Sequence, residues 1–174
     1  MAINPINPMA DLFAPRKALT DHLQKLVEQG VIRGVAQAQD FSEVMDGVTP
    51  ANHGFVYVTY DKSKNTTTQG IHSIKSTEVY TLILAWRNNR SELSNDGHGM
   101  DEAGVTKSLI EFHVHGWTID NQYRSATTGK PFIISESSPE AFYRAGGWGF
   151  YPMSFDIEVT RVRPKPNTNP KPLT

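Results

Sequence analysis

The residues of this sequence best suited to bind a metal ion are two histidines separated by one position, His113 and His115. Zinc is held by imidazole nitrogens among other ligands, and its sites in proteins are close to tetrahedral. Residues at positions i and i+2 share one face of a strand, but on a helix they diverge by about 200°. The apolar spacing around this pair predicts the C-terminal end of a helix, where the helix dipole favours histidine. We therefore expect structural roles for both, with a metal-dependent enzyme as the alternative; such a site would have to recruit histidines such as His53, His72 or His98.

The segment from Asp96 to Glu102 (DGHGMDE) has residue types found in phosphate-binding and calcium-binding loops. It lacks the Lys-Ser/Thr pair of a P-loop and the acidic spacing of a calcium loop. Carboxylates at Asp101 and Glu102 are explained as the first turn of a helix, where they complement the helix dipole. The sequence also contains no Gly-x-Ser-x-Gly or His-Glu-x-x-His motif and no cysteine, which removes thiol nucleophiles and thiolate metal ligands. We predict that the chain is not an enzyme and binds no cofactor or metal.

Aromatic residues are interleaved with glycine and arginine between Tyr143 and Tyr151, with Trp148 and Phe150 in the second half. Such rings can stack on the bases of single-stranded nucleic acid when a basic groove accompanies them. The chain has 17 basic and 18 acidic residues and a net charge of -1, which argues against a basic face. Aromatic residues beside glycine are also typical of loops and subunit contacts. We expect this second role and keep a single-stranded nucleic-acid binder as a further alternative.

The length of 174 residues and the hydrophobic content of 38% are sufficient for one domain with its own core. We expect this domain to span residues 15–163. Residues 1–14 contain two prolines and no apolar periodicity, which predicts an extended arm. Residues 164–174 contain four prolines, which predicts a polyproline-like tail. No apolar run approaches the ~20 residues that a membrane-spanning helix needs, so we expect no membrane partner.

Hydrophobic periodicity predicts two main helices. The first runs from Pro15, a favourable first helical residue, to Gly30, a favourable residue after a helix end. The second begins near Asp101 and ends at Gly116-Trp117. Gly104 inside it disfavours a helix, and close packing onto a sheet would compensate. The broad apolar face expected for this helix consists of Ala103, Val105, Leu109, Ile110, Phe112 and Val114.

Alternating and β-branched residues predict the strands of a mixed, mostly antiparallel sheet, so the expected fold class is α+β with the two helices packed on the sheet. Residues 79–88 have apolar side chains on both faces, which predicts a central strand covered on both sides. Residues 153–160 alternate cleanly between Pro152 and Pro164, which predicts an edge or terminal strand. The other expected segments are strands at 31–39, 55–60 and 132–136, a helical turn at 41–46, polar loops at 61–70, 91–99 and 120–130, and a short helix starting at Ser138-Pro139 and ending at Gly146-Gly147.

The central strand requires two covering layers, whereas only two substantial helices are expected and both can lie on one side. The other face is then covered by the segment of the last strand or by a neighbouring subunit. Under the second hypothesis, Trp86 and its surroundings lose burial in an isolated monomer.

Four features in a fixed order give the sequence a likeness to a known family. An amphipathic N-terminal helix and a strand precede Val56–Asp61 (VYVTYD), which is followed by Leu82–Asn88 (LILAWRN). A helix closing in Gly116-Trp117 comes next, and Phe150–Phe155 (FYPMSF) lies near the C-terminus. In this order the features resemble the tail terminator proteins of long-tailed bacteriophages, particularly the Mu-like and related tail terminator-like group. The resemblance covers residues 15–162, and the chain departs from it at 133–144 and in the proline-rich tail.

The resemblance implies a non-enzymatic structural protein of the virion tail, assembled in the host cytoplasm and located at the head–tail junction. Members form a ring, generally a hexamer, which caps the finished tail tube, ends its polymerisation and joins the tail to the head connector. The implied partners are other copies of the chain, the major tail tube protein and the head–tail connector or completion proteins, while genomic DNA passes through the lumen without specific binding. Another head–tail joining or tail completion protein is the alternative. The candidate subunit-interface residues are Trp86, Arg87, Arg90, Trp148 and Tyr151.

Overall fold

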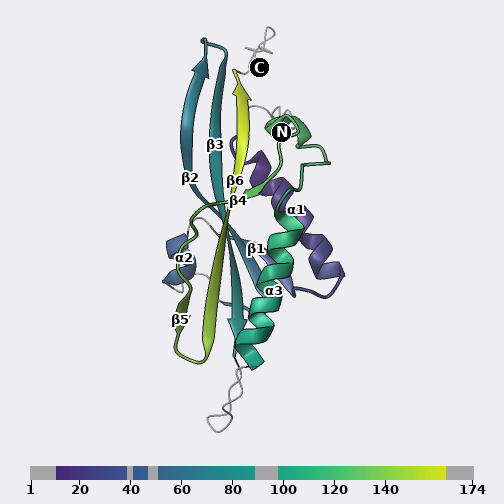
Figure 1. Ribbon diagram of the computed structural model, residues 1–174, viewed down its shortest axis with the longest axis vertical. Helices are drawn as coiled ribbons and strands as arrows, with labels where there is room; N and C mark the ends of the chain where they lie inside the picture. Colours follow the sequence, from purple (N-terminus) through teal and green to yellow (C-terminus); the bar gives the residue numbers. More distant parts are fainter. Residues whose placement is uncertain (1–10, 39–40, 47–50, 89–97, 164–174) are drawn as a thin grey trace, which may run out of the picture.

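The computed structural model describes residues 11–38, 41–46, 51–88 and 98–163 of the chain. Six strands form one sheet in the order β1-β2-β3-β6-β4, with β5 paired to another part of β6 (Figure 1). β1 and β2 are parallel, and the other pairings are antiparallel. The predicted α+β class, with a mostly antiparallel sheet and two main helices, is confirmed. The elements are α1 (Ala14–Glu28), β1 (Gly34–Gln37), α2 (Phe41–Met45), β2 (Phe55–Gln69), β3 (Ser73–Arg87), α3 (His98–Val114), the 3-10 helix η2 (Arg124–Thr127), β4 (Ile133–Ile134), β5 (Phe142–Arg144) and β6 (Trp148–Val162).

α1 begins and ends close to its predicted bounds. Pro15 lies in the first turn, and Gly30 follows the helix with a φ of 73°, a left-handed conformation that glycine adopts without steric cost. The apolar side of α1 buries Leu19 and Leu23 against the sheet. The strand expected at 31–39 is shorter, because only Gly34–Gln37 pair with β2. Most of the arm expected at 1–14, and the whole tail at 164–174, lie outside the described residues.

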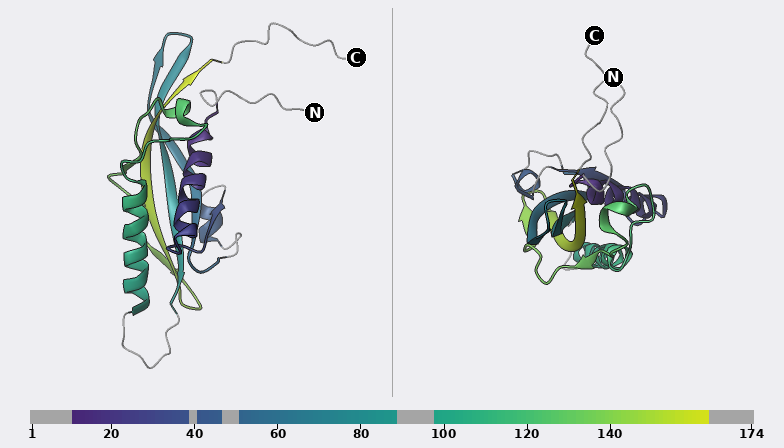
Figure 2. Two further views of the ribbon diagram at one scale, coloured as in Figure 1. Left: turned by 90° about the vertical axis from the view of Figure 1, so that its right-hand side faces the viewer. Right: turned by 90° about the horizontal axis from the view of Figure 1, so that it is seen from above.

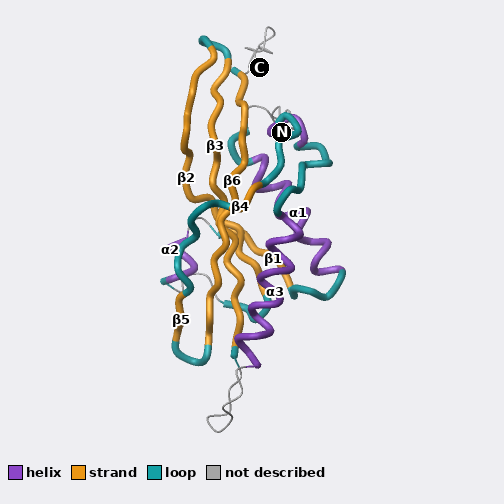
Figure 3. Tube along the Cα trace, in the orientation of Figure 1, coloured by secondary structure: helices purple, strands orange, loops and turns teal. Residues whose placement is uncertain are grey.

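β2 and β3 are longer than predicted, with 15 residues each. The prediction of a polar loop at 61–70 is wrong, because residues 61–69 continue β2. They pair with the first half of β3, with two shifts of register along the way. This segment includes three consecutive threonines, Thr66–Thr68, whose β-branched side chains favour strands. Most of its residues are exposed, so its polar composition is compatible with a solvated strand. The two strands form a ribbon that extends beyond the helices (Figures 1 and 3).

The central strand β3 is covered on both faces, as predicted. On one face, here called the helix face, Tyr80, Leu82 and Leu84 pack with apolar residues of α1 and α3. On the opposite face, Ile83 and Ala85 pack with residues of α2 and β6. α1 and α3 therefore lie on the same side of the sheet, and α2 lies on the other (Figure 2). The hypothesis that a neighbouring subunit covers part of β3 stays a prediction. Trp86, the residue whose burial it concerns, is half-buried in the single chain.

α3 has apolar residues on two sides, which corrects the prediction of one broad apolar face. At about 100° per residue, positions 105, 109 and 112 point away from the side that packs on the sheet. Phe112 is 82% exposed. Gly104 is also exposed, and apart from the neighbouring backbone of α3 no described atom lies within 4 Å of where a Cβ would lie, so the prediction of close packing at this glycine is wrong as well. The buried side carries Ala103, Thr106, Ile110 and Val114, and the exposed side carries Val105, Leu109 and Phe112.

The prediction of a short helix from Ser138 to Gly147 is wrong. Residues 142–144 instead form β5, which joins β6 through a turn where Gly146 and Gly147 both have positive φ. Ser138-Pro139 has the residue types of a helix start, but the Ser138 Oγ accepts a hydrogen bond from the backbone N–H of Ser154 in β6. The hydroxyl thus stabilises the sheet instead of capping a helix.

β6 has the predicted alternation, with Met153, Phe155, Ile157 and Val159 buried on the helix face. It is not an edge strand, because it pairs with β3 on one side and with β4 and β5 on the other. Pro152 lies between the residues that pair with β5 and those that pair with β4, so its missing N–H interrupts neither pairing.

Candidate interaction surface

One end of the sheet gathers aromatic and arginine side chains from three strands. The register of β3 and β6 pairs Arg87 with Trp148 and Trp86 with Gly149. Four of the five candidate interface residues, which are far apart in the sequence, therefore come together in the fold; the fifth, Arg90, lies outside the described residues. We use the name aromatic–arginine cluster for Trp86, Arg87, Tyr143, Arg144, Trp148 and Tyr151.

On the face of the sheet that lies opposite the helix face, two guanidinium groups of the cluster lie over aromatic rings. The Cζ atom of Arg87 is 5.9 Å from the centre of the Trp148 ring, and that of Arg144 is 4.7 Å from the centre of the Phe150 ring. Cation–π contacts are worth about 0.5–1 kcal/mol at exposed sites and more where the pair is shielded from water, as at the fully buried Phe150 ring. Phe142 stacks on Phe150 at 4.6 Å and anchors β5 beside them. These contacts position the side chains before any partner binds.

On the helix face, the cluster includes Trp86 and Tyr151. The ring of His53 packs edge-to-face on Trp86 at 4.5 Å, and its Nδ1 accepts a hydrogen bond from the backbone N–H of Arg87 at 3.0 Å. Because Nδ1 is the acceptor, the neutral ring carries its proton on Nε2. Burial lowers the pKa of His53, and the positive charges of Arg33 and Arg87 lower it further. The neutral ring is therefore favoured.

The residue types of the cluster are those of a protein interface. Tyrosine, tryptophan and arginine are enriched at the positions that dominate binding energy. Tyr143 is 60% exposed and lies 6.2 Å from the ring of Tyr151, so one aromatic side chain is already accessible beside a more buried one. These six side chains contain no pairing of a nucleophile with a general base. The arrangement suits association with another protein surface.

The run from Trp148 to Tyr151 does not form one stacking platform. Strand alternation places Trp148 and Phe150 on the opposite face and Tyr151 on the helix face. Phe150 is also fully buried. Binding of successive bases requires accessible rings along one surface, so this geometry weakens the nucleic-acid alternative.

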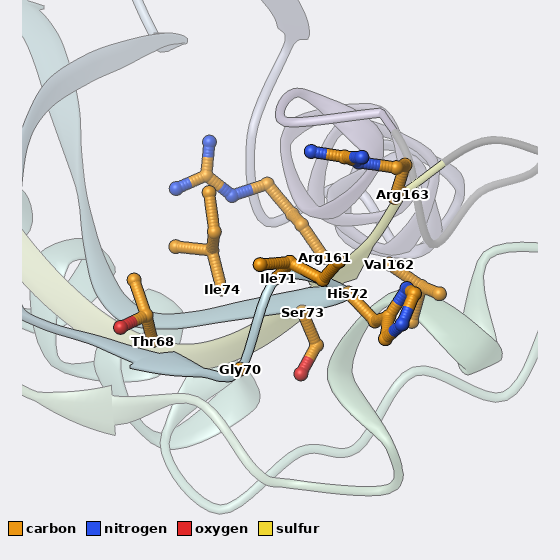
Figure 4. Close-up of a pocket in the computed structure, with 9 residues that line it drawn as sticks. All are labelled: Thr68, Gly70, Ile71, His72, Ser73, Ile74, Arg161, Val162 and Arg163. Atoms are coloured by element: carbon orange, nitrogen blue, oxygen red, sulfur yellow. The ribbon is translucent and has the colours of Figure 1, made fainter.

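The other end of the same strands carries a groove of ≈ 490 Å³, here called the tip groove (Figure 4). It lies where the β2–β3 turn meets the end of β6. Ile71 in its wall is 72% exposed. None of its lining residues is acidic, so it combines apolar and cationic side chains and is complementary to an acidic surface. Its main side chains are Ile71, His72, Ile74, Arg161, Val162 and Arg163.

The two candidate metal ligands have different hydrogen-bond partners. The Nε2 of His113 lies 3.2 Å from the backbone oxygen of His22, whereas the Nδ1 of His115 accepts a hydrogen bond from a backbone N–H of β4 at 3.1 Å. The described parts of the chain contain no group of three or more His, Cys, Asp or Glu side chains that could hold a metal ion. Of the other histidines considered, His53 contacts the aromatic–arginine cluster, His72 lines the tip groove, and His98 begins α3.

His113 forms a reciprocal contact with a histidine that sequence reasoning missed. His22 of α1 is 7% exposed and stacks on His113 at 4.1 Å and on Trp117 at 3.7 Å. Its Nε2 lies 3.0 Å from the backbone oxygen of His113, so each ring donates its Nε2–H to the other residue's carbonyl. Burial lowers the pKa of His22 to about 4. The available signal in the sequence was helical spacing, because His22 lies on the apolar stripe between Leu19 and Leu26.

A buried carboxylate was missed as well. Glu78 in β3 is fully buried and accepts hydrogen bonds from the hydroxyls of Tyr60, Ser63 and Ser76. The guanidinium of Arg161 donates to the Ser76 hydroxyl at 3.4 Å, which brings a positive charge to the same network. Position 78 shares a face of β3 with the buried residues at 80, 82 and 84, and this alternation is the signal that predicts its burial.

No protein-family model matches the sequence, and no curated protein matches it. In the part of the chain that the structure describes, no helix is long and apolar enough to cross a membrane.

Proposed function

We propose that the chain is a structural protein of a bacteriophage virion, a tail terminator that forms a ring on the tail tube. The aromatic–arginine cluster is the observation that supports this function best. Two of the motifs that carry the resemblance, LILAWRN and FYPMSF, lie side by side in β3 and β6. Together they supply Trp86, Arg87 and Tyr151 of the cluster, whose composition is that of a protein contact.

A closed ring of identical subunits needs two unlike contact surfaces on each subunit, because each copy meets its two neighbours through different patches. The aromatic–arginine cluster and the tip groove differ in composition and lie at opposite ends of β3. We assign the cluster to one of the two patches through which a subunit meets its neighbours. The projecting ribbon, with the tip groove, is assigned to the tail tube or the head connector.

In this function the ring, generally a hexamer in the family, caps the tube, ends its polymerisation and joins the tail to the head connector at the head–tail junction. Assembly of this kind requires no catalytic residue, cofactor or metal. Genomic DNA passes through the lumen, and the net charge of -1 is compatible with a channel that does not retain it.

Native mass spectrometry and a tube-capping assay test the proposal. We expect the purified chain to form a ring, and tubes grown from the major tail protein to stop elongating and to carry a ring at one end in negative-stain images. A chain that stays monomeric and never binds a tube end would overturn the proposal. A ring that binds the head connector but leaves tube growth unchanged would indicate a head–tail completion protein.

The variant Arg87→Glu tests the assignment of the cluster. It reverses the charge that lies over Trp148, and we expect it to shift rings to smaller species. Its melting temperature should stay close to that of the wild type, because Arg87 is exposed. Arg124→Glu is the matched control, since it makes the same charge reversal at an exposed position in η2. Equal populations of rings in both variants would contradict the assignment.

A further inference from the structure

The outward side of α3 carries an apolar surface that is left exposed by the parts of the chain that the structure describes. Val105 is 62%, Leu109 47% and Phe112 82% exposed, and these residues follow one another at helical spacing. Scattered apolar residues on a surface need no explanation, but a contiguous patch is typical of an interaction site. The large exposed ring of Phe112 is the most unusual member.

The same side of α3 contains a hollow. An open depression of ≈ 510 Å³ is lined by Asp101, Gly104, Val105, Ser108, Leu109 and Phe112. Four of these positions, 101, 104, 105 and 108, have the spacing i, i+3, i+4 and i+7, which forms the hole that receives a side chain in knobs-into-holes helix packing. Gly104 leaves room in this hole because it has no Cβ, and apart from the neighbouring backbone of α3 no described atom lies within 4 Å of where a Cβ would lie.

Phe112 can act as the knob that enters such a hole, and Phe112 and Gly104 lie symmetrically about Ser108. Phe112 follows Ser108 by four residues, and Gly104 precedes it by four. When two such helices pack antiparallel about a twofold axis near Ser108, Phe112 of each helix lies at the height of Gly104 of the other. The surface is therefore complementary to a second copy of itself.

Two polar side chains have the same symmetry. Asp101 and His115 each lie seven residues from Ser108, on opposite sides, and both are exposed. The Nδ1 of His115 accepts a backbone N–H of β4, so its Nε2 carries the ring proton and is available as a donor. In the antiparallel arrangement this donor comes near Asp101 of the other copy.

We propose that two copies of the chain pair through the outward sides of α3, antiparallel, with Phe112 of each in the hollow of the other. This contact is isologous, unlike the heterologous contacts of a ring, so it does not depend on the proposed function. A contact made by one helix from each copy is smaller than a standard interface of about 1,200–2,000 Å². We expect a dissociation constant on the order of micromolar or weaker.

A cysteine crosslink tests the geometry directly. The chain contains no cysteine, so a single Ser108→Cys substitution places two thiols near the twofold axis. We expect this variant to form a disulfide-linked dimer under mild oxidation. Gln24→Cys, at an exposed position of α1, is the matched control and should crosslink much more slowly. Equal crosslinking of the two variants, or none at Ser108→Cys, overturns the proposal.

Sedimentation analysis of Gly104→Leu separates pairing from folding. Leucine fills the hollow and abolishes the dimer, yet the melting temperature of the monomer should not fall, because the position is open and leucine is a better helix former than glycine. Phe112→Ser should also abolish the dimer. Gln24→Leu, the control, should leave it intact. A dimer that survives Gly104→Leu or Phe112→Ser overturns the proposal, and so does a wild type that shows no pairing through α3. If Phe112→Ser then abolishes tube capping by the ring, the surface belongs to the contact with the tube protein instead.

Discussion

Acidification is expected to weaken the contact between α1 and α3 at His22. Burial is the main reason why the pKa of this ring falls from 6.5 to about 4, and the hydrogen bond to the His113 carbonyl opposes the shift. The charges of His113 and Lys25 lower the pKa further, whereas Asp120 raises it. The ring is neutral in the folded protein at neutral pH, where it stacks between His113 and Trp117.

A group whose pKa is lower in the folded state than in the unfolded state gains a proton preferentially on unfolding. The stability that neutral His22 contributes is complete above pH 6.5 and is lost progressively as the pH falls from 6.5 to about 4. At about 1.4 kcal/mol per pH unit, the full difference corresponds to about 3 kcal/mol. Partial screening by solvent reduces this, and we expect roughly 2 kcal/mol.

Urea denaturation of the wild type and of His22→Gln, at several values between about pH 7 and about pH 4, measures this contribution. Glutamine has an N–H group that can donate to the His113 carbonyl, but it does not titrate. All other ionisable groups are common to both proteins, so the difference between their free energies of unfolding isolates His22. We expect the advantage of the wild type to decrease by roughly 2 kcal/mol on acidification. A difference that stays constant with pH would refute this reasoning.

Three further substitutions have expected costs in the free energy of unfolding, each measurable by the same denaturation experiment. Gly147→Ala should cost about 1–3 kcal/mol, because the glycine has a φ of 77° and a Cβ would lie 2.5 Å from the backbone oxygen of Asn88. Glu78→Gln should cost about 2–3 kcal/mol, because it removes a buried charged acceptor from three hydroxyl donors. Tyr80→Phe should cost about 1 kcal/mol, because its hydroxyl donates to the backbone oxygen of Leu12 at 3.1 Å.

Matched controls separate these mechanisms from general sensitivity to mutation. Gly146 has a similar positive φ, but a Cβ at this position would meet only a side-chain atom at 3.8 Å. Gly146→Ala should therefore reduce the free energy of unfolding by less than Gly147→Ala does. Glu140→Gln changes an exposed carboxylate and should be nearly neutral. Equal costs within either pair would contradict the assigned cause. For Tyr80→Phe, an unchanged free energy of unfolding would show that the hydrogen bond to Leu12 makes no net contribution.

Much of the fold was predictable from hydrophobic spacing. α1 and β6 each have one apolar face, and the spacing of the apolar residues on that face indicates a helix in the first case and a strand in the second. α3 was only half predictable, because its apolar residues lie on two sides and sequence alone does not distinguish a core face from an exposed one. β5 was missed because Ser138-Pro139 favours a helix start locally, whereas pairing with β6 determines the structure.

The candidate site was predictable to a smaller extent. Trp86, Arg87, Trp148 and Tyr151 were expected at an interface because of the resemblance, and the structure places them together; their role stays a prediction. The tip groove depends on the polar half of β2, which has no hydrophobic pattern to indicate a strand. Pairing between distant segments, and the resulting grooves, are properties of the register, which a single sequence specifies only weakly where strands are polar.

The pairing of β3 with β6 has a mechanical consequence. It runs without interruption from Ser73 and Val162, at the tip groove, to Arg87 and Trp148, at the aromatic–arginine cluster. A force applied between partners bound at these two ends acts along the strands, so the backbone hydrogen bonds of the ladder are sheared together and share the load. Peeling the strands apart would instead break the same bonds one pair at a time. The long ladder thus makes the chain stiff along the axis that joins its two candidate contact surfaces.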